Sequence, residues 1–312
     1  MYTHTNALLS YADFVTAIQN LVDHVKKQRT MATNEGLELY NLGEFNRAKL
    51  HLLIAATDGN KEAQYALAEV LRRDAGNMTE EARNWYQKAA GQDHFYALLR
   101  LADGTSLAKA KALAEANADP AERLLQLYEL TGDIESLRKS ERAGSSEAKC
   151  ILAYSYGRDE KLVPSGLTPT AEQTRLLLEA AIAGLPKAMA WYPRLLTVRD
   201  KTTRRAWLEK RLQLNDVNAL LDYAFAISTE YDMDEDEQEY GYEKDLVKAY
   251  ALLWLVSDTT RQFKRHADTV KNLAHLEAQL TAQEITDAKQ QAQAWKLSHP
   301  PMSEYRLTYQ EF

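Results

Sequence analysis

The residue types that most often carry catalysis are few and scattered in this 312-residue chain. None of its seven His residues forms a His-Glu-x-x-His zinc motif, and no Gly-x-Ser-x-Gly elbow, P-loop or dinucleotide fingerprint is present. The single cysteine, Cys150, precedes Ile151 and Leu152, which favours a small core residue over a nucleophile. We therefore predict a chain that is not an enzyme, with no catalytic residue, no metal and no cofactor.

The segment from Glu230 to Asp245 has the spacing closest to that of a metal site. Asp232, Asp234, Asp236 and Glu243 match positions 1, 3, 5 and 12 of a calcium-binding loop, but glutamates stand where that loop needs a glycine and a hydrophobic residue. This favours a solvated acidic loop between the two helices of the last repeat. A docking loop for a basic partner is the alternative, and its candidate residues are Asp232, Asp234, Glu235, Asp236, Glu237 and Glu239.

The net charge of −7 comes from this acidic segment, which carries nine acidic residues and one Lys. The rest of the chain is close to neutral, so we expect no general affinity for nucleic acid. Residues 194–211 hold a basic cluster with Trp207 among them. We interpret this cluster as a solvated helix face, because nucleic-acid binding is the less common use of such a run.

The N-terminal residues show no basic stretch followed by an apolar one, so we recognise no signal peptide. No window approaches 18 apolar residues, and no membrane span is expected. These features predict a cytoplasmic protein, or a periplasmic one if a signal peptide has been removed. We expect a monomer or a weak oligomer.

A recurring pair of residues organises the chain into repeats. At six places a Gly, Asn or Asp stands four residues before an Ala, and these three residue types most readily adopt the left-handed conformation that ends a helix. The Ala, here called the repeat alanine, is small enough to let helices pack closely. Amphipathic periodicity on both sides predicts units of helix, loop, helix and turn. The six pairs are Gly59–Ala63, Asp93–Ala97, Asn117–Ala121, Gly144–Ala148, Gly184–Ala188 and Asn215–Ala219.

Sequence signals for the starts of helices agree with this division of the chain into repeats. Thr170–Gln173 and Thr281–Glu284 are expected capping boxes. The dipeptide Asp119-Pro120 predicts an N-cap followed by the first helical residue. The longest step between repeat alanines contains residues 164–169, with two prolines and a glycine, which predicts a loop between helices.

The segments Ala55–Ala63 and Ala180–Ala188 both read Ala-Ala-x-x-Gly-x-x-x-Ala, a pattern that resembles the Sel1-like repeat, a relative of the tetratricopeptide repeat. The segment Lys244–Trp254, together with residues 280–284 and 292–295, is similar to the closing repeat and capping helix of bacterial members. This resemblance implies an all-α fold: an α-solenoid of about seven helix–turn–helix repeats in a right-handed superhelix with a concave groove and capping helices. It also implies protein–protein contact, without identifying the partner.

Three regions follow from this interpretation. Residues 31–297 are the expected repeat array, with residues 230–245 as an acidic insertion. Residues 298–312 are expected to form an extended tail, whose Tyr305, Leu307, Tyr309 and Phe312 fold back on the array or bind a partner. Residues 1–30 are expected to form an N-terminal capping helix with five apolar residues on one face: Phe14, Ile18, Leu21, Val22 and Val25.

The resemblance implies that the first helix of each repeat lines the groove. Counted from the repeat alanine, positions −1, +2, +6 and +9 share one helical face beside the packing face. Tyr, Arg and Phe are frequent there, as in binding hot spots, although packing between repeats explains Tyr65, Tyr154 and Phe225 equally well. The partner-binding candidates are Glu62, Tyr65, Glu69, Arg72, Arg123, Leu127, Tyr154, Lys187, Arg194 and Phe225.

We therefore predict a non-catalytic scaffold or adaptor that binds another protein in its groove, such as a component of a bacterial complex. The alternative that the resemblance implies is a bacterial immunity protein or antagonist that neutralises a secreted toxin effector. A hydrolase-type enzyme is the third alternative. It requires a cleft in which catalytic residues converge, and no spacing in the sequence indicates one.

Overall fold

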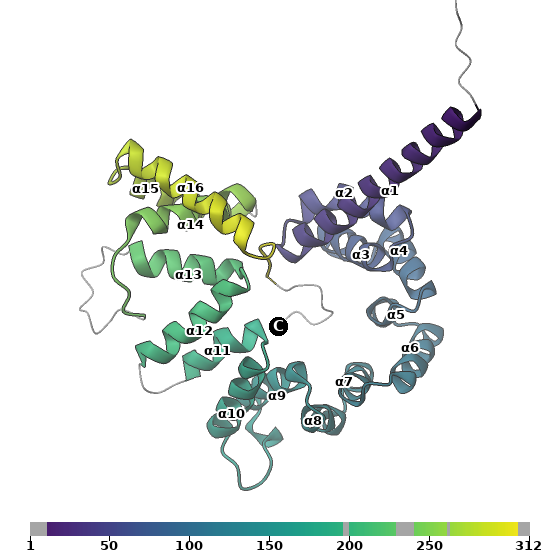
Figure 1. Cartoon of the computed structure of the whole chain (residues 1–312). Coiled ribbons are helices and arrows are strands. Elements are labelled where there is room, and N and C mark those ends of the chain that lie inside the picture. The colour runs from purple at the N-terminus through teal and green to yellow at the C-terminus, as the bar shows by residue number, and fades with distance from the viewer. Residues whose placement is uncertain (1–10, 196–199, 229–239, 261–262, 305–312) are drawn as a thin grey trace, which may run out of the picture. The chain divides into compact units, whose positions relative to one another are not determined.

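The computed structural model describes residues 11–195, 200–228, 240–260 and 263–304. These residues form α-helices and one 3-10 turn, with no strand among them (Figure 1). In chain order they are α1 (Tyr11–Asn41), α2 (Phe45–Thr57), α3 (Lys61–Ala75), α4 (Glu80–Gly91), α5 (Phe95–Leu101), α6 (Gly104–Ala116), α7 (Pro120–Thr131), α8 (Ile134–Arg142), α9 (Ser146–Arg158), η1 (Glu160–Leu162), α10 (Pro169–Ile182), α11 (Pro186–Leu195), α12 (Lys201–Gln213), α13 (Val217–Ser228), α14 (Leu246–Thr259), α15 (Phe263–Glu277) and α16 (Ala282–Ser298).

Most helices pack against the helices before and after them in the chain, which is the arrangement of a solenoid. In the described part of the chain, the first fourteen α-helices follow one another as seven helix pairs in chain order, from α1 with α2 to α13 with α14. Helices α15 and α16 both pack on α14. The prediction of an all-α solenoid with about seven helix–turn–helix repeats is therefore confirmed. The handedness of a superhelix stays a prediction.

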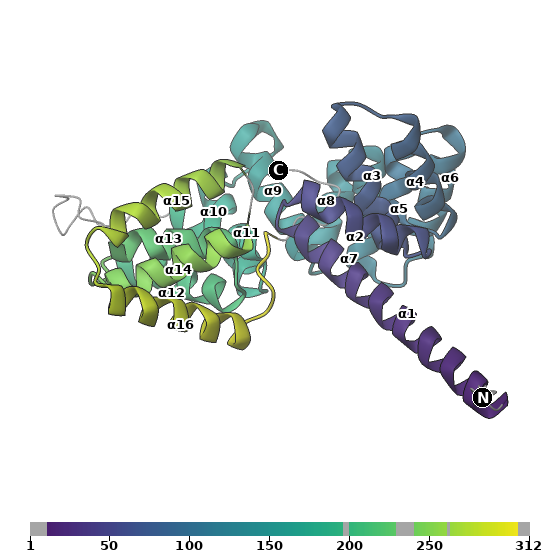
Figure 2. The same cartoon turned by 90° about the horizontal axis from the view of Figure 1, so that it is seen from above.

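The chain divides into two compact units. The first unit comprises residues 1–40 and 45–97, and the second comprises residues 41–44 and 98–312. In the first unit α1 runs without a break past residue 30, so the expected capping helix and the first repeat helix are one element, whose N-terminal part extends beyond α2 (Figure 2). The side chains of the apolar face expected between Phe14 and Val25 lie outside the described part of the chain.

Close approach between α1 and α2 depends on a glycine inside α1. A Cβ added to Gly36 would lie 3.0 Å from the backbone nitrogen of Leu52 and 3.2 Å from the Cβ of His51. Contacts this short are tighter than real side chains tolerate, so a larger residue here would push the helices apart.

The repeat alanines fill the places where helices meet. Ala63, Ala97, Ala148, Ala188 and Ala219 are fully buried, whereas Ala121 is only half-buried. Around Ala148, Ala188 and Ala219, larger apolar residues form two cores within the second unit. One core gathers residues from α7 to α12, such as Leu152 and Leu176, and the other gathers residues from α12 to α16, such as Leu220 and Leu253. Each such leucine stabilises the fold by about 1.5–3 kcal/mol through burial.

Five of the six predicted left-handed turns are present. Gly59, Asp93, Gly144, Gly184 and Asn215 have φ between 54° and 107°. At the sixth place the prediction is wrong, because the turn residue has φ −65° and an extended conformation. The side chain of this residue, Asn117, accepts a bond from the Asp119 N–H, and Pro120 follows so closely that the chain stays extended up to the next helix.

Two of the three predicted helix starts are confirmed. Asp119 accepts N–H bonds from Ala121 and Glu122 at the start of α7, and Thr281 forms a complete capping box with Glu284. The capping box at Thr170–Gln173 is wrong, because α10 begins earlier, at Pro169. Gln173 instead donates to the carbonyl oxygen of Ala153 and so joins α10 to α9.

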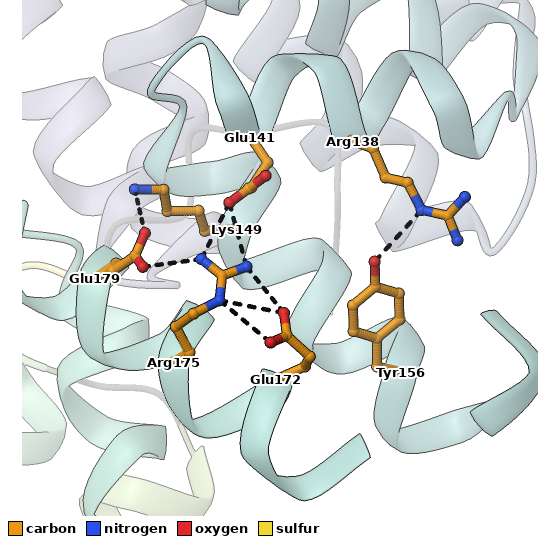
Figure 3. A network of polar contacts seen from close by, with 7 residues as sticks. All are labelled: Arg138, Glu141, Lys149, Tyr156, Glu172, Arg175 and Glu179. Atoms are coloured by element: carbon orange, nitrogen blue, oxygen red, sulfur yellow. Dashed lines mark hydrogen bonds and ion pairs between the residues drawn. The ribbon is translucent and has the colours of Figure 1, made fainter. Parts of the chain in front are cut away.

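A network of charged side chains joins α8, α9 and α10 in the second unit (Figure 3). The guanidinium group of Arg175 contacts three carboxylates, of Glu141, Glu172 and Glu179, at 2.8–3.3 Å. Lys149 of α9 contacts Glu179 at 2.8 Å. Since Glu141 belongs to α8 and the other two carboxylates to α10, the network links the second helices of two consecutive repeats.

The chain after α16 returns to the turn between α12 and α13. The side-chain amide of Asn215 donates to the carbonyl oxygen of Pro300 at 2.7 Å, and its oxygen accepts the indole N–H of Trp295 at 3.0 Å. The backbone of Ser303 pairs with Asp216 in an isolated bridge. The aromatic residues predicted to fold back or bind, Tyr305 to Phe312, lie outside the described residues.

Candidate protein-binding surface

In the first unit the structure overturns part of the predicted binding face. Tyr65 and Glu69 of α3 are each only 1% exposed, so their predicted contact with a partner is wrong. The ring of Tyr65 stacks on the imidazole of His94 at 4.5 Å and lies against Tyr86 at 6.0 Å. Aromatic residues from the next helices therefore cover the part of α3 that the helical phase alone places beside a groove.

Glu69 is instead the centre of an internal polar cluster. Its carboxylate accepts the hydroxyl hydrogen of Tyr86 at 2.8 Å and a guanidinium hydrogen of Arg72 at 2.9 Å. Burial, together with the adjacent Glu69 charge, raises the pKa of Tyr86, so this phenol stays protonated. The candidate Arg72 is therefore engaged in stabilising the fold of the first unit.

Glu62, the remaining candidate on α3, pairs with a buried histidine. The Nε2 atom of His94 lies 3.0 Å from the Glu62 carboxylate, and this hydrogen bond lowers the pKa of Glu62. The other ring nitrogen, Nδ1, accepts the backbone N–H of Ala97 at 3.2 Å at the start of α5. Because both ring nitrogens are occupied by structural bonds, this carboxylate–imidazole pair is not arranged as a general base.

In the second unit two of the predicted residues do come together. Tyr154 of α9 stacks against Trp191 of α11, with ring centroids 5.8 Å apart. The ammonium group of Lys187 lies 5.0 Å from the Trp191 ring, and the guanidinium group of Arg158 lies 5.4 Å from the Tyr154 ring. These four side chains, Tyr154, Arg158, Lys187 and Trp191, form a stacked aromatic pair with one cation beside each ring, which is called the aromatic–cation cluster below.

Helical spacing explains how the sequence builds this cluster. Tyr154 and Arg158 are four residues apart on α9, and Lys187 and Trp191 are four residues apart on α11, so each pair lies on one helical face. The repeat alanines Ala148 and Ala188 bring the two helices into equivalent positions. Sequence reasoning missed Trp191 and Arg158, although the spacing of four residues from the predicted members was the signal that could have found them.

Partial burial adjusts the charge of the cluster. It lowers the pKa of Lys187 to about 8, even though the carboxylate of Glu147 opposes the shift. The adjacent thiol of Cys150 is only 3% exposed, and burial raises its pKa to about 11. Cys150 is therefore protonated near neutral pH and has the role of a small core residue, as predicted.

The other predicted face residues have different surroundings. Arg123 donates to the carbonyl oxygen of Asn117 at 3.2 Å, which is at the C-terminal end of α6. Phe225 packs against the core around α13 and α14, so only part of its side chain is available to a partner. Leu127 is half-buried on α7, and Arg194 is exposed near the end of α11.

The basic segment 194–211 is only partly a solvated face. Arg211 is 5% exposed and pairs with Asp216 at 3.2 Å and Asp222 at 3.1 Å. Trp207 is also buried, with the ammonium group of Lys210 lying 4.2 Å from its ring. The interpretation as a solvated face is therefore wrong for Arg211, whose charge is required inside the fold to balance two carboxylates.

The acidic docking residues Asp232, Asp234, Glu235, Asp236, Glu237 and Glu239 lie outside the described residues, as does most of the calcium-loop pattern. Among the described residues, no group of three or more His, Cys, Asp or Glu side chains could hold a metal ion. No helix of the described chain is both long and apolar enough to cross a membrane.

Comparison with known proteins gives distant structural similarity. No family model matches the chain, and no curated protein matches it. The chain is similar to a protective antigen of uropathogenic Escherichia coli strains that displays an SLR fold, with 18% identity and a TM-score of 0.46 over 88% of this chain. The chain spans 62% of the length of that protein. It is also similar to a Sel1 repeat protein from Oxalobacter formigenes, with 18% identity and a TM-score of 0.33, over 66% of this chain and 95% of the other.

Proposed function

We propose that this chain is a protein-interaction scaffold that holds a protein partner against the aromatic–cation cluster on α9 and α11. The observation that carries the proposal is the stacked pair of Tyr154 and Trp191, which lies at the surface between two consecutive repeats. Tyr154 is 37% exposed, although covering its ring would stabilise the chain.

The chemistry of the cluster suits a protein surface. Tyr, Trp and Arg dominate binding hot spots, since each combines a large apolar contact area with a polar group. The contacts of Arg158 with Tyr154 and of Lys187 with Trp191 hold the two rings in place before a partner arrives. Side chains that are already ordered lose less entropy on binding, which raises affinity.

A catalytic role has less support. The two groups most suited to hydrolysis, His94 and Cys150, are both buried. The ring nitrogens of His94 are engaged by Glu62 and by the backbone of Ala97, and the thiol of Cys150 is protonated near neutral pH. We therefore prefer a binding function to a hydrolase function.

Two narrower functions fit this proposal: neutralising a secreted toxin effector, and organising a bacterial complex. Each needs one exposed surface that recognises one protein. We also propose that the chain acts in the cytoplasm as a monomer. The identity of the captured partner distinguishes the first two forms, because a toxin and a complex component differ in their own activities.

The test is partner capture from a lysate of the source cells by the immobilised chain, followed by mass spectrometry. Tyr154→Ala combined with Trp191→Ala is compared with Ile182→Ala, a control on α10 that changes a side chain 67% exposed. We expect the control to retain the partner and the double variant to lose about tenfold or more in affinity.

Circular dichroism checks that both variants remain folded. Capture that is equally strong in the double variant would show that the cluster is not the binding site. Tyr65 is unsuitable as a test position, because its burial means that substitution would disturb the fold itself.

A further inference from the structure

The turn between α12 and α13 holds an extended piece of the chain's own backbone. Residues 300–304, called the strap below, follow α16 and lie along this turn. The backbone of Ser303 uses both of its hydrogen-bonding groups there. Its N–H donates to the carbonyl oxygen of Asn215 at 3.3 Å, and its carbonyl oxygen accepts the N–H of Val217 at 3.2 Å. The strap therefore pairs with the turn in the way that one parallel β-strand pairs with another.

The turn offers polar groups that suit an extended peptide. Val217 is the first residue of α13, and the first N–H groups of a helix have no acceptor within that helix. The side-chain amide of Asn215 donates to the carbonyl oxygen of Pro300 at 2.7 Å. The indole N–H of Trp295 donates to the other end of this amide at 3.0 Å and so fixes its orientation. These groups contact only the backbone of the strap, so they can receive any extended segment.

Two side chains of the strap supply selectivity. Met302 is 6% exposed and belongs to the apolar core formed by α12 to α16. The carboxylate of Glu304 forms an ion pair with the guanidinium group of Arg265 in the first turn of α15, and both side chains are buried. A buried charge that loses its partner is strongly destabilising, so such a pair discriminates against other residues. The site thus selects a large apolar residue that is followed, two positions later, by a carboxylate.

The strap is an addition to helices that already pack on one another. Helix α13 packs on α14, and α14 also packs on α15 and α16. Pro300 and Pro301, which join the strap to α16, are both exposed. Because proline fixes φ near the value of an extended chain, the two prolines lower the conformational entropy that the strap loses when it lies along the turn.

We infer that the turn between α12 and α13 is a peptide-binding site, that the strap occupies it as an internal ligand, and that an extended partner segment with the same apolar-x-acidic pattern takes the strap's place. The strap is tethered beside the site, so a partner segment competes with an effective concentration on the order of millimolar. The strap is thereby an autoinhibitory contact, which excludes segments that lack the pattern. This surface differs from the aromatic–cation cluster, so this inference and the proposed function can each fail without the other.

The test measures binding of the strap sequence as a separate peptide. The probe is a fluorescein-labelled peptide of residues 299–304 with a blocked C-terminus, and fluorescence anisotropy reports its binding to the full-length chain. Met302→Asp places a charge in the apolar core and so releases the strap of the chain itself. Leu297→Asp makes the same kind of change at an 88% exposed residue of α16 and is the matched control. The peptide should bind the Met302→Asp chain about tenfold more tightly than the wild type or the control.

Two further variants test the backbone pairing and the place of binding. Ser303→Pro removes the N–H that pairs with Asn215 and keeps the apolar anchor, so it should also raise the affinity for the peptide, by about threefold or more. Asn215→Gly keeps the left-handed turn, where φ is 54°, and removes the amide. Added to the Met302→Asp chain, it should lower the affinity about tenfold. A peptide with Asp in place of Met, and another with Lys in place of Glu, should not bind.

Three outcomes would overturn the inference. The first is that the peptide binds the Met302→Asp and Ser303→Pro chains no more tightly than the Leu297→Asp control. The second is equal binding by the peptide that carries Asp in place of Met, which would place the attraction elsewhere on the chain. The third is loss of the helical circular dichroism signal in both strap variants, which would show that the strap is an inseparable part of the fold and not a displaceable ligand.

Discussion

The same repeat position has opposite surroundings in the two units of the molecule. Glu69 and Tyr154 each follow their repeat alanine by six residues, yet Glu69 is 1% exposed and Tyr154 is 37% exposed. In the first unit Tyr86 of α4 reaches over α3 and donates to Glu69. In the second unit the neighbour of Tyr154 is Trp191, a residue of the first helix of the next repeat, and Tyr154 stays partly exposed. The position of a residue relative to its repeat alanine sets the direction in which its side chain leaves the helix. The size of the neighbouring side chains decides whether solvent reaches it.

The largest expected effect on stability comes from removing the carboxylate of Glu69, the buried residue of the two. Glu69→Ala leaves the Tyr86 hydroxyl without its acceptor and the partly buried Arg72 without its counter-charge, so we expect a loss of about 2–4 kcal/mol in the free energy of unfolding. Tyr154→Ala should cost less than about 1 kcal/mol, because its ring is already partly solvated. Urea denaturation followed by circular dichroism measures both.

Glu69→Gln is the matched control, since it keeps an acceptor for Tyr86 and removes only the charge. We expect its loss to lie between those of Glu69→Ala and Tyr154→Ala. Equal losses for Glu69→Ala and Tyr154→Ala would contradict the conclusion that neighbours, and not repeat phase, determine the role of this position.

The next effect tests the repeat alanine itself. Ala188→Trp inserts a large ring where α10 and α11 meet, and overpacking of this kind costs about 1–3 kcal/mol or more. Ile182→Trp, at the end of the preceding helix α10, enlarges a residue that is 67% exposed and should change stability by less than about 0.5 kcal/mol. Thermal unfolding of the two variants gives the difference, and similar midpoints would show that Ala188 is not a close-packing position.

Much of the fold was readable from the sequence because the signals are local. Gly59, Gly144 and Gly184 mark left-handed turns, and Thr281 marks a helix start, through residues only a few positions away. Burial of Tyr65 could not be read in this way, because His94 and Tyr86, more than twenty residues further on, cover it. A cluster such as Tyr154 with Trp191 likewise requires knowing which two helices become neighbours.

A pH comparison sharpens the contrast at the position before the repeat alanine, where Glu62 stands in one unit and Lys187 in the other. The folded-state pKa of Glu62 is lowered below 4.5 by its bond with His94, so this bond stabilises the protein above that pH and is lost as pH falls through the lowered pKa. Glu62→Gln should therefore reduce the destabilisation of the chain by acid below about pH 4.5.

The charged form of Lys187 destabilises the folded chain, whereas the charged form of Glu62 stabilises it. Its pKa is lowered from 10.5 to about 8 because partial burial disfavours the charged form, so the unfolded chain binds more protons between these two values. Lys187→Met should stabilise the chain near pH 7, by no more than about 1 kcal/mol after solvent screening, and this gain should disappear by pH 10.5. A gain that is the same at pH 7 and pH 10.5 would mean that packing, and not charge, is responsible.

The smallest expected effect concerns charges that are neither buried like Glu69 nor arranged for binding like the aromatic–cation cluster. Arg175 contacts three carboxylates, but its own side chain is 43% exposed, so solvent screens each contact. Arg175→Ala should cost about 0.5–1 kcal/mol at low salt, and the cost should shrink by about half at 1 M salt, where the screening length is about 3 Å. Urea denaturation at the two salt concentrations measures this, with Arg142→Ala, a 65% exposed neighbour on α8 whose only described ion pair is 4.0 Å long, as the control. A loss as large as that of Glu69→Ala, and insensitive to salt, would show that the network is held as rigidly as the buried cluster and that exposure is not what separates the two.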